Sequence, residues 1–507
     1  MRPAICIALL GTWGCTGALS GAPDAAGRRD ATVDDASSRP DRASIPEDVG
    51  VWPPGAPGCG LDSAAFCETF DAISRHRGRA GDLDNRRWSC ARNNPQLPTG
   101  NGATIAAGPA TVTGCRADVP TRVFPDSDAL ICDANDAIQS SHLLVAVGAQ
   151  NYGQNSYRIR QPFDFHGRTG RIAFDADAHF ENLVLGWVSI AITEDPTPAP
   201  SYSIGGPNTD NDEGGAIPRN ALEIHFRDNC AGRAEPGHFT VALVDVLHDF
   251  VDTTLPLDTT TCIVGQAGHL NHFEIAVSRS HVEIYGTDAS ADGVHFGPLQ
   301  LLFAGDVDLP FERGYVHLTT HNHATLKYTE HGEFGYTTPL DAWTTRWDNV
   351  GFDGPVVGGW REYEAPDSLV MGTQAWNLHN GVVNVGYRVA DEAGSPNDVI
   401  HIPDVDPSTA TRASLALTGW YNLFGSPPGN WVLRYRVNGH DWIEYRLDAD
   451  EIAVLTNTHS HGSTSQLLDV PVAQLVTGDN TIELTSRNVD QGYPPAVANI
   501  DLILETP

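Results

Sequence analysis

Hydrophobic and polar residues alternate in short runs over most of the chain after residue 58, and turn residues separate these runs. In 273–277 and 281–285 the apolar residues occupy every second position, which predicts a β-hairpin with its turn at Arg279-Ser280. The segment 183–192 is almost continuously apolar, as expected for a central strand that is buried on both faces. No helical pattern interrupts 59–355, so the periodicity predicts one large antiparallel β-sandwich.

Residues 360–507 predict a second β-sandwich of about 150 residues, the size of one domain. Its clearest hairpin joins the alternating runs 431–437 and 440–445 through Asn438-Gly439. Asn-Gly is the strongest short hairpin signal because both turn residues need a positive φ angle. We therefore expect an all-β chain in which a large antiparallel sandwich, a jelly roll over 59–356, precedes a smaller C-terminal sandwich over 360–507.

The first 58 residues have a different character. Arg2, an apolar stretch over 5–10 and small residues near Cys15 predict a short export signal over 1–15. Residues 16–58 contain almost no large apolar side chains, so they cannot bury enough surface to fold and are expected to form a disordered tether. The segment Leu10-Gly11-Thr12-Trp13-Gly14-Cys15 resembles the lipobox of bacterial lipoproteins.

That resemblance implies that Cys15 carries a lipid at the N-terminus of the mature protein. The alternative is an ordinary cleaved signal with a chance cysteine. In either case the chain is exported, and the lipid would place it in the cell envelope, at the outer membrane or cell surface. No later run of about 18 apolar residues occurs, so membrane attachment is expected through Cys15 alone.

The composition narrows the range of partners. Lys and Arg total 31 against 64 Asp and Glu, which gives a net charge of −33. A surface this acidic repels phosphate backbones, so nucleic acid is not an expected partner. It also disfavours acidic polysaccharides unless calcium bridges them.

Seven cysteines follow Cys15, and in an exported protein they are expected to form disulfides. They are Cys59, Cys67, Cys90, Cys115, Cys132, Cys230 and Cys262. An odd number leaves one thiol over. Cys230 and Cys262 each end an alternating run on either side of a predicted strand pair, so we expect them to bond. The loop of about 30 residues would contribute roughly 3–4 kcal/mol. The pairing of the other five stays open.

Two stretches resemble known β-sandwich families. The β pattern of 59–355 and its ending Trp347-Asp348-Asn349-Val350-Gly351-Phe352-Asp353-Gly354-Pro355 resemble concanavalin A-like lectin/glucanase and laminin-G-like domains. The segments 475–484 and 498–504 resemble galactose-binding-like jelly rolls, which are common beside polysaccharide-active domains. The first resemblance implies a concave sheet face that holds a sugar.

The segment 315–328 contains the sharpest candidate site. In a strand, alternate side chains share a face, and one face of this segment carries His317, Thr319, His321, His323 and Lys327. Imidazole groups donate and accept hydrogen bonds, which suits the recognition of sugar hydroxyls. There are two alternatives. The first is a zinc site, because two of the imidazoles would point the same way. The second is a solvated outer face with no ligand.

A second candidate is Glu223-Ile224-His225-Phe226-Arg227-Asp228. Retaining β-glucanases of the concanavalin-like fold carry Glu-x-Asp-x-x-Glu on a strand, and the outer carboxylates act as nucleophile and acid/base. Glu223 matches the first position, His225 replaces the middle Asp, and Asp228 replaces the last Glu. Because positions 223 and 228 of a regular strand face opposite sides, catalysis by this pair requires a bulge. Otherwise Glu223, His225 and Arg227 are alternate exposed residues.

Two groups of carboxylates are candidate calcium ligands. Asp210 and Asp212 lie in an acidic turn whose alternating oxygen ligands suit a hard cation, or form a plain surface turn. Carbohydrate-binding modules of families 6 and 35 place a structural calcium between a Glu of the first strand and an Asp of the last. Glu364 and Asp501 resemble that pair. No other cofactor is indicated.

We therefore expect an exported, lipid-anchored carbohydrate-binding protein whose partner is a polysaccharide or other glycan. The first alternative is a glycoside hydrolase or polysaccharide lyase. The second is an adhesion or structural protein of the envelope with no glycan ligand. Whether the chain is an enzyme is left open by the sequence, and a non-catalytic role is favoured because two of the three glucanase positions are altered.

The lipid anchor can be tested by membrane fractionation in a bacterial host. The full chain should sediment with membranes, and Cys15→Ala should move to the soluble fraction because the variant lacks the thiol that would carry lipid. Equal membrane retention of the two forms would contradict the prediction.

Overall fold

The structure is a computed structural model, and it describes sixteen segments of the chain. They are 54–93, 110–124, 127–147, 153–177, 186–196, 217–227, 237–257, 261–322, 326–328, 334–336, 343–365, 382–384, 398–420, 431–457, 463–488 and 496–507. Contacts divide the chain into Met1–Val49 and Gly50–Pro507, and every described residue belongs to the second unit. Cys15 and most of the expected tether therefore lie outside the described residues.

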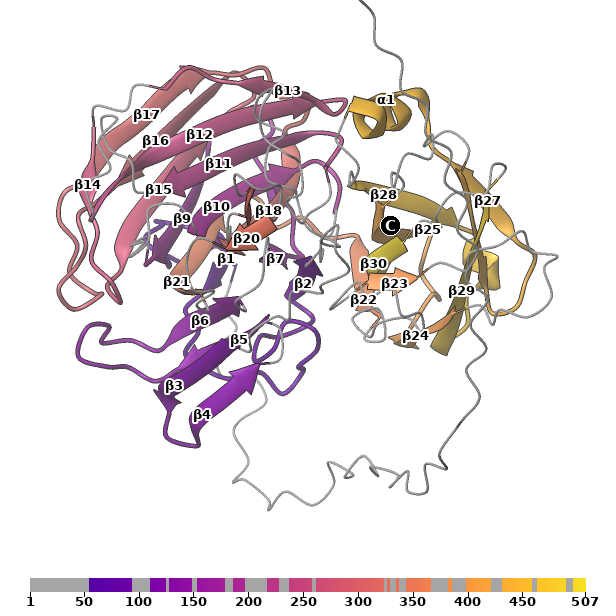
Figure 1. Cartoon of the computed structure of the whole chain (residues 1–507), viewed down its shortest axis with the longest axis horizontal. Coiled ribbons are helices and arrows are strands. Elements are labelled where there is room, and N and C mark those ends of the chain that lie inside the picture. The colour runs from indigo at the N-terminus through magenta and orange to yellow at the C-terminus, as the bar shows by residue number, and fades with distance from the viewer. Residues whose placement is uncertain are drawn as a thin grey trace, which may run out of the picture. The chain divides into compact units, whose positions relative to one another are not determined.

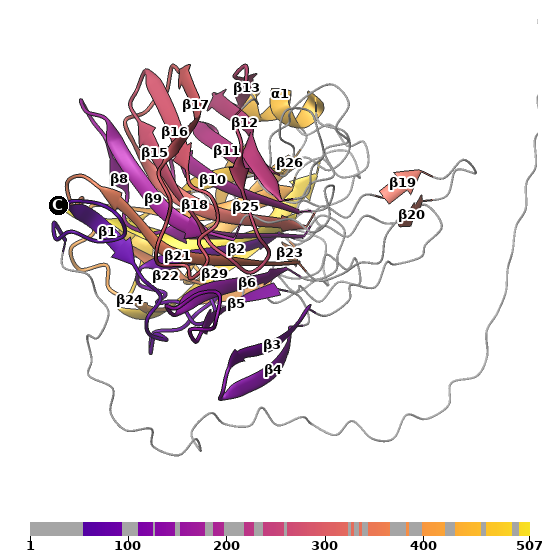
Figure 2. The same ribbon diagram turned by 90° about the vertical axis from the view of Figure 1, so that its left-hand side faces the viewer.

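Two antiparallel sheets form the first sandwich in the described part of the chain (Figure 1). The eight-stranded sheet has the order β17 (Gln300–Asp306), β16 (His281–Gly286), β15 (Asn271–Val277), β9 (Gly170–Ala176), β21 (Trp343–Asp353), β6 (His142–Val147) and β5 (Ser127–Cys132), and β1 (Ala64–Glu68) pairs with β21. The nine-stranded sheet has the order β13 (Val251–Thr254), β12 (His238–His248), β11 (Ala221–Arg227), β10 (Gly186–Thr193), β18 (Arg313–Asn322), β7 (Gly153–Ile159) and β2 (Trp88–Asn93), with β14 (Ile263–Val264) on β12 and β8 (Phe163–Asp164) on β18. Two hairpins lie outside these sheets: β3 (Ala110–Arg116) with β4 (Val119–Phe124), seen in Figure 2, and β19 (Leu326–Tyr328) with β20 (Phe334–Tyr336).

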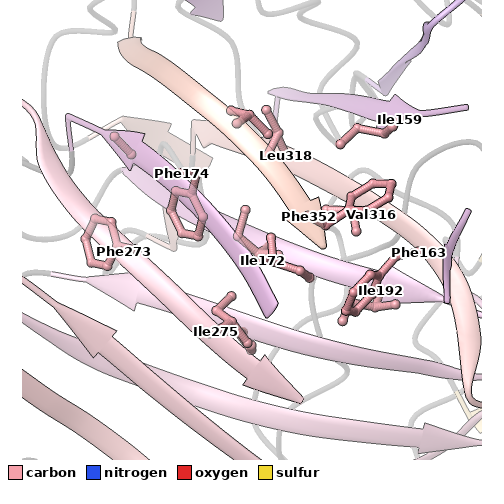
Figure 3. Packing of buried hydrophobic residues seen from close by; sticks show 14 of the residues in the cluster. Ile159, Phe163, Ile172, Phe174, Ile192, Phe273, Ile275, Val316, Leu318 and Phe352 are labelled. Atoms are coloured by element: carbon pink, nitrogen blue, oxygen red, sulfur yellow. The ribbon is translucent and has the colours of Figure 1, made fainter. Parts of the chain in front are cut away.

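The core of this sandwich lies between the two sheets, where every second side chain of each strand points inward. Phe174 and Phe273 of the eight-stranded sheet stack with ring centroids 5.1 Å apart, and Phe226 of the other sheet lies 4.8 Å from Phe273. Figure 3 shows Phe174, Phe273 and Ile172 near Val316 and Leu318 of β18. Burial of this aromatic and β-branched set fixes which face of each strand is inward.

The C-terminal sandwich also consists of two antiparallel sheets among the described residues. One has the order β22 (Trp360–Glu364), β30 (Ala496–Glu505), β25 (Arg412–Trp420) and β28 (Ser463–Val470), with β23 (Val382–Asn384) on β30. The other has the order β24 (Asp398–Val405), β29 (Gly478–Asn488), β26 (Trp431–Val437) and β27 (Ile443–Arg446). The short helix α1 (Ala449–Asn457) and a 3-10 turn over Val472–Gln474 complete it. The expected fold class, a large antiparallel β-sandwich followed by a smaller one, is confirmed.

Local sequence signals are confirmed in several strands. β15 and β16 pair as a hairpin, with Val277 opposite Val282. Asn438 and Gly439 both adopt positive φ angles, of 49° and 71°, in the turn between β26 and β27. β10 lies between β11 and β18, and its described side chains are buried on both faces, as the apolar run 183–192 predicts. No helix in the described ranges is long and apolar enough to cross a bilayer.

The cysteines form disulfides, as the export signal predicts. Cys59 bonds to Cys67 and Cys115 to Cys132, while Cys90 is a buried thiol of β2. Cys262 is also disulfide-bonded. Cys230 lies outside the described residues, so its pairing with Cys262 stays a prediction.

The two sandwiches share buried contacts. Leu247 and Phe250, at the end of β12, belong to the same apolar cluster as Leu415 and Leu502 of the C-terminal sandwich. Ile217, just before β11, forms a parallel bridge with Thr464 of β28. These contacts join the β11–β12 edge of the first sandwich to the C-terminal sandwich.

An ionic cluster surrounds the Trp347-Asp348-Asn349 motif of β21. The pairing of β21 with β9 is irregular between Asp348 and Gly351, and Asn349 has a positive φ of 48°. There the Asn349 side chain donates to Asp175, which also lies 2.6 Å from His272 Nδ1. The second ring nitrogen of His272 is 3.6 Å from Glu274. Burial lowers the pKa of His272, but the two carboxylates outweigh burial and raise it to about 9.

This cluster predicts a pH dependence of stability. Because the pKa of His272 is raised above the unfolded value of about 6.5, its contribution is complete below that pH and is lost as the pH rises through about 9. His272→Gln should destabilise the protein most below pH 6.5, and the difference from wild type should shrink by pH 9. Urea unfolding of both proteins across this range tests the prediction. A difference that does not change with pH would contradict it.

Candidate functional site

A row of polar side chains covers the face of the nine-stranded sheet that lies opposite the apolar core. We call it the polar strip; its members are Ser89, Ser156, Arg158, Ser189, Glu223, His225, Asp245, His317 and Thr319. Each is at most 4% exposed. The strand register sets Asp245, Glu223, Ala191, His317 and Arg158 side by side across five strands. The strip therefore joins the two sequence-predicted sites, around Glu223 and around His317, on one face.

Two of the five residues of the histidine site, His317 and Thr319, have described side chains. β18 carries His317 and Thr319 on the polar strip and continues through His321, whose side chain lies outside the described residues. His323 is also outside them. Lys327 lies in β19, opposite Gly335, and its side chain is likewise not covered. The predicted shared face therefore holds for His317 and Thr319, and for the other three residues it remains a prediction.

His317 takes part in a directional chain of hydrogen bonds. The Thr193 hydroxyl donates to the Asp195 carbonyl, so it accepts from His317 Nε2–H at 3.0 Å. The Thr319 hydroxyl donates to Ser156, which in turn donates to His317 Nδ1 at 3.3 Å. Burial, and then the charge of Arg158, lower the pKa of His317 well below its usual range. The ring is therefore neutral, and both of its nitrogens are engaged, so His317 orders the strip instead of offering a nitrogen to a ligand.

The other end of the strip differs, because its carboxylates lack donors. Glu223 and Asp245 face each other across β11 and β12, at 2% and 0% exposure. Neither has a hydrogen-bond partner within the described part of the chain, and Nε2 of His225 lies 3.6 Å from Glu223. Burial and then the charge of Asp245 raise the pKa of Glu223 well above its usual range.

Two further titratable groups border this pair. Asp252 of β13 is half-buried, and burial together with Asp245 and Glu223 raises its pKa to about 7. Burial lowers the pKa of His225 to about 4, so its ring is neutral at physiological pH. Burial of a carboxylate without a compensating cation or donor costs free energy. The carboxyl oxygens at this end of the strip can therefore still accept hydrogen bonds from a ligand.

The expected partner of Glu223, Asp228, lies outside the described residues, just beyond the end of β11. The described part of β11 does not contain the bulge that the Glu223–Asp228 pair requires: the extra residue is Ala242 of β12, because His225 pairs with Leu243 but Phe226 pairs with Val241. Asp245 is the carboxylate that faces Glu223 in this structure. Sequence reasoning missed it, although the alternation Val244-Asp245-Val246 was the available signal.

Glu364 and Asp501, the predicted calcium ligands, also face each other across strands. Arg79 Nη2 lies 2.6 Å from Asp501, and Arg79 Nε lies 3.5 Å from Glu364. The set does not fit calcium as it stands, because a guanidinium occupies the position between the carboxylates. Within the described ranges no three His, Cys, Asp or Glu residues converge as a metal site. Asp210 and Asp212 lie outside those ranges, so calcium there stays a prediction.

Arg79 belongs to a larger buried network between the sandwiches. Arg158 donates to Glu362, Arg160 lies 3.7 Å from Glu364, and Ser89 donates to Asp501 at 2.7 Å. Three arginines of the first sandwich thus meet three carboxylates of the second. Burial opposes ionisation of Glu362, but Arg158 and Arg160 outweigh it and lower its pKa to about 2. These six charges compensate one another where β2 and β7 meet β22 and β30.

Solved structures similar to this chain are lectin-like domains and glycoside hydrolases. The VIP36 exoplasmic/lumenal domain in its Ca2+/Man3GlcNAc-bound form is 12% identical, with 46% of this chain and 85% of that chain covered at a TM-score of 0.25. A glycoside hydrolase family 16 endo-glucanase from Bacteroides ovatus is 9% identical, with 57% and 99% covered at a TM-score of 0.30. The Emp47p carbohydrate recognition domain is 10% identical, with 48% and 95% covered at a TM-score of 0.26. No family model and no curated protein matches.

The unsatisfied carboxylates predict that Glu223 destabilises the fold. Because its pKa is raised, the stability should fall as the pH rises above the usual glutamate value of about 4.3. Glu223→Gln abolishes this ionisation and offers a donor to Asp245, so it should raise the free energy of unfolding at neutral pH by about 1–3 kcal/mol. Denaturant unfolding from acid to neutral pH measures both effects. A variant that is less stable than wild type throughout would refute this reading.

Proposed function

We propose that this chain is an exported carbohydrate-binding protein of the cell envelope and that its glycan binds at the Glu223–Asp245 end of the polar strip. The proposal rests on a difference in hydrogen bonding between the two ends of the strip. The hydrogen bonds of His317 are complete, whereas both carboxylates of the Glu223–Asp245 pair have no donor within the described residues. A ligand that supplies hydroxyl donors would satisfy them.

Sugar hydroxyls suit this end of the strip for two reasons. Carboxylates accept from two neighbouring hydroxyls at once, and the charge assistance makes such bonds strong. The neighbouring His225 is neutral, so it adds a donor or acceptor without a charge. Asp252, which is half-buried, lies at the solvent side of the group. The net charge of −33 repels nucleic acid from such a surface.

His321, His323 and Lys327 would extend the ligand surface from His317 and Thr319 along the chain. Cys15 would attach the protein to the membrane through a lipid, and residues 16–58 would act as the tether. The first sandwich would span 59–356 and the C-terminal, galactose-binding-like sandwich 360–507. Structural calcium would bind at Asp210 and Asp212.

A glycoside hydrolase is the second candidate, and one observation favours it. Residues directly opposite in an antiparallel pair have Cβ atoms about 5 Å apart, and retaining hydrolysis needs two carboxyl groups roughly 5 Å apart. Glu223 and Asp245 are such a pair. The raised pKa of Glu223 would keep it protonated as the general acid, and Asp245 would serve as the second carboxylate.

Glycan-array binding of the full chain carrying Cys15→Ala tests the proposal. Asp245→Asn and Glu223→Gln should each weaken binding to the recognised glycan at least tenfold, because each change replaces a carboxyl oxygen with an amide nitrogen that cannot accept from a hydroxyl. His321→Ala with His323→Ala should also abolish binding while stability changes by less than about 1 kcal/mol, as for exposed residues.

The same experiment separates the candidates. Release of reducing ends from the recognised glycan, lost in Glu223→Gln, would establish the hydrolase. Binding without release would establish the lectin-like role. An array on which wild type binds nothing would reject both and leave an adhesion or structural role in the envelope.

A further inference from the structure

A pocket lies at the junction of the two sandwiches, near the Arg158 end of the polar strip, because its lining residue Glu362 accepts from Arg158. Its volume is about 760 Å³. It is lined by residues 75–77 and 85–87, which precede β2, by 357–364 at the start of β22, and by Pro403 and Asp404 of β24. We call it the junction pocket. None of the carboxylates at the Glu223–Asp245 end of the strip lines it.

The junction pocket is positively charged in a protein that is otherwise strongly acidic. Six arginines line it against three carboxylates, Glu362, Glu364 and Asp404. The arginines are Arg75, Arg77, Arg86, Arg87, Arg160 and Arg361. The chain has 31 Lys and Arg and a net charge of −33. These six arginines are therefore about a fifth of its basic side chains. Guanidinium groups match a carboxylate with two parallel hydrogen bonds.

Two exposed arginines of the pocket, Arg86 and Arg361, form ion pairs with aspartates. Arg86 is 54% exposed and pairs with Asp84, two residues earlier in the chain. Arg361 is 46% exposed and pairs with Asp406, itself 44% exposed. An exposed pair such as Arg361–Asp406 contributes little to stability, so a ligand carboxylate can share or replace Asp406.

The inner wall of the pocket combines a donor with acceptors. Arg160, Glu362 and Glu364 have side chains that are at most 5% exposed. Arg160 Nη2, Glu362 Oε2 and Glu364 Oε2 make no hydrogen bond within the described part of the chain, and Arg160 Nη2 lies 3.7 Å from Glu364 Oε2. A hydroxyl group is the ligand group that accepts from the guanidinium and donates to the carboxylate.

Aromatic rings supply the remaining chemistry of a sugar site. Phe66, Trp360 and Tyr363 line the same pocket. Trp360 and Tyr363 are half-buried, so part of each ring is accessible. A partly accessible aromatic ring can pack against the apolar C–H face of a sugar, while neighbouring polar groups bind the sugar hydroxyls.

We propose that the junction pocket binds an acidic saccharide, a uronic acid residue whose carboxylate meets the outer arginines and whose hydroxyls face Arg160 and Glu364. The net charge of the protein repels long polyanions, so the ligand is a chain end or a short oligosaccharide. This site is separate from the glycan site at Glu223 and Asp245, and each can exist without the other.

Isothermal titration of the full chain carrying Cys15→Ala with a galacturonate tetrasaccharide tests the proposal. Wild type should bind it at least tenfold more tightly than the neutral galactose tetrasaccharide. Arg86→Gln with Arg361→Gln should abolish this preference, because both exposed guanidinium groups are lost. The matched control Arg412→Gln removes an equally exposed arginine (62%) outside the pocket and should bind like wild type.

Three results would overturn the proposal: no binding of the charged tetrasaccharide, equal affinity for the charged and neutral sugars, or an equal loss in Arg412→Gln. Unfolding midpoints of the variants should match wild type, which shows that a loss of binding is not a loss of folding. Glu223→Gln should leave titration with the galacturonate unchanged. Loss of array binding in Glu223→Gln and loss of galacturonate binding in the double arginine variant therefore report on the two sites independently.

Discussion

The structure depends on the compensation of buried charge between its two sandwiches. The first sandwich contributes three buried arginine side chains: Arg79, Arg158 and Arg160. The second contributes the carboxylates that neutralise them: Glu362, Glu364 and Asp501. An isolated buried ion is far more costly than a paired one. Loss of one partner at this interface would leave an uncompensated buried charge, and the apolar contacts of Leu247 and Phe250 add to the interface.

The same network defines the surroundings of the polar strip. Arg158 occupies one end of the strip and lies in the network, while its charge helps to keep His317 neutral. At this end, His317 bonds to Ser156 and Thr193, and Thr319 donates to Ser156. At the other end, Glu223 and Asp245 have no hydrogen-bond partner among the residues that the structure describes. We therefore expect ligand binding at the Glu223–Asp245 end, where buried polar groups lack protein partners among the described residues. A hydrogen bond that stabilises the fold is not available to a ligand, so stability and ligand binding compete.

The junction pocket shows the reverse distribution of charge. Four of its six arginines lie within residues 75–87 and a fifth is Arg361, whereas Arg160 belongs both to the pocket and to the buried network. The Glu223–Asp245 end of the strip and the pocket are thus two different electrostatic environments in one acidic chain. The first has buried carboxylates that lack a partner among the described residues, and the second has accessible guanidinium groups. Their ligands should differ accordingly.

The sequence by itself determined the strands and the face on which each side chain lies. Alternation in 273–285 and the Asn438-Gly439 turn are local signals, because strand period and turn φ angles depend on neighbouring residues. It also placed Glu223 and His317 as candidates. Only the tertiary structure decided that the two share one strip, that Asp245 faces Glu223, and that Arg79 lies between Glu364 and Asp501. Such pairings depend on strand order and on packing between sandwiches, which bring together residues far apart in the chain, and no local pattern encodes them.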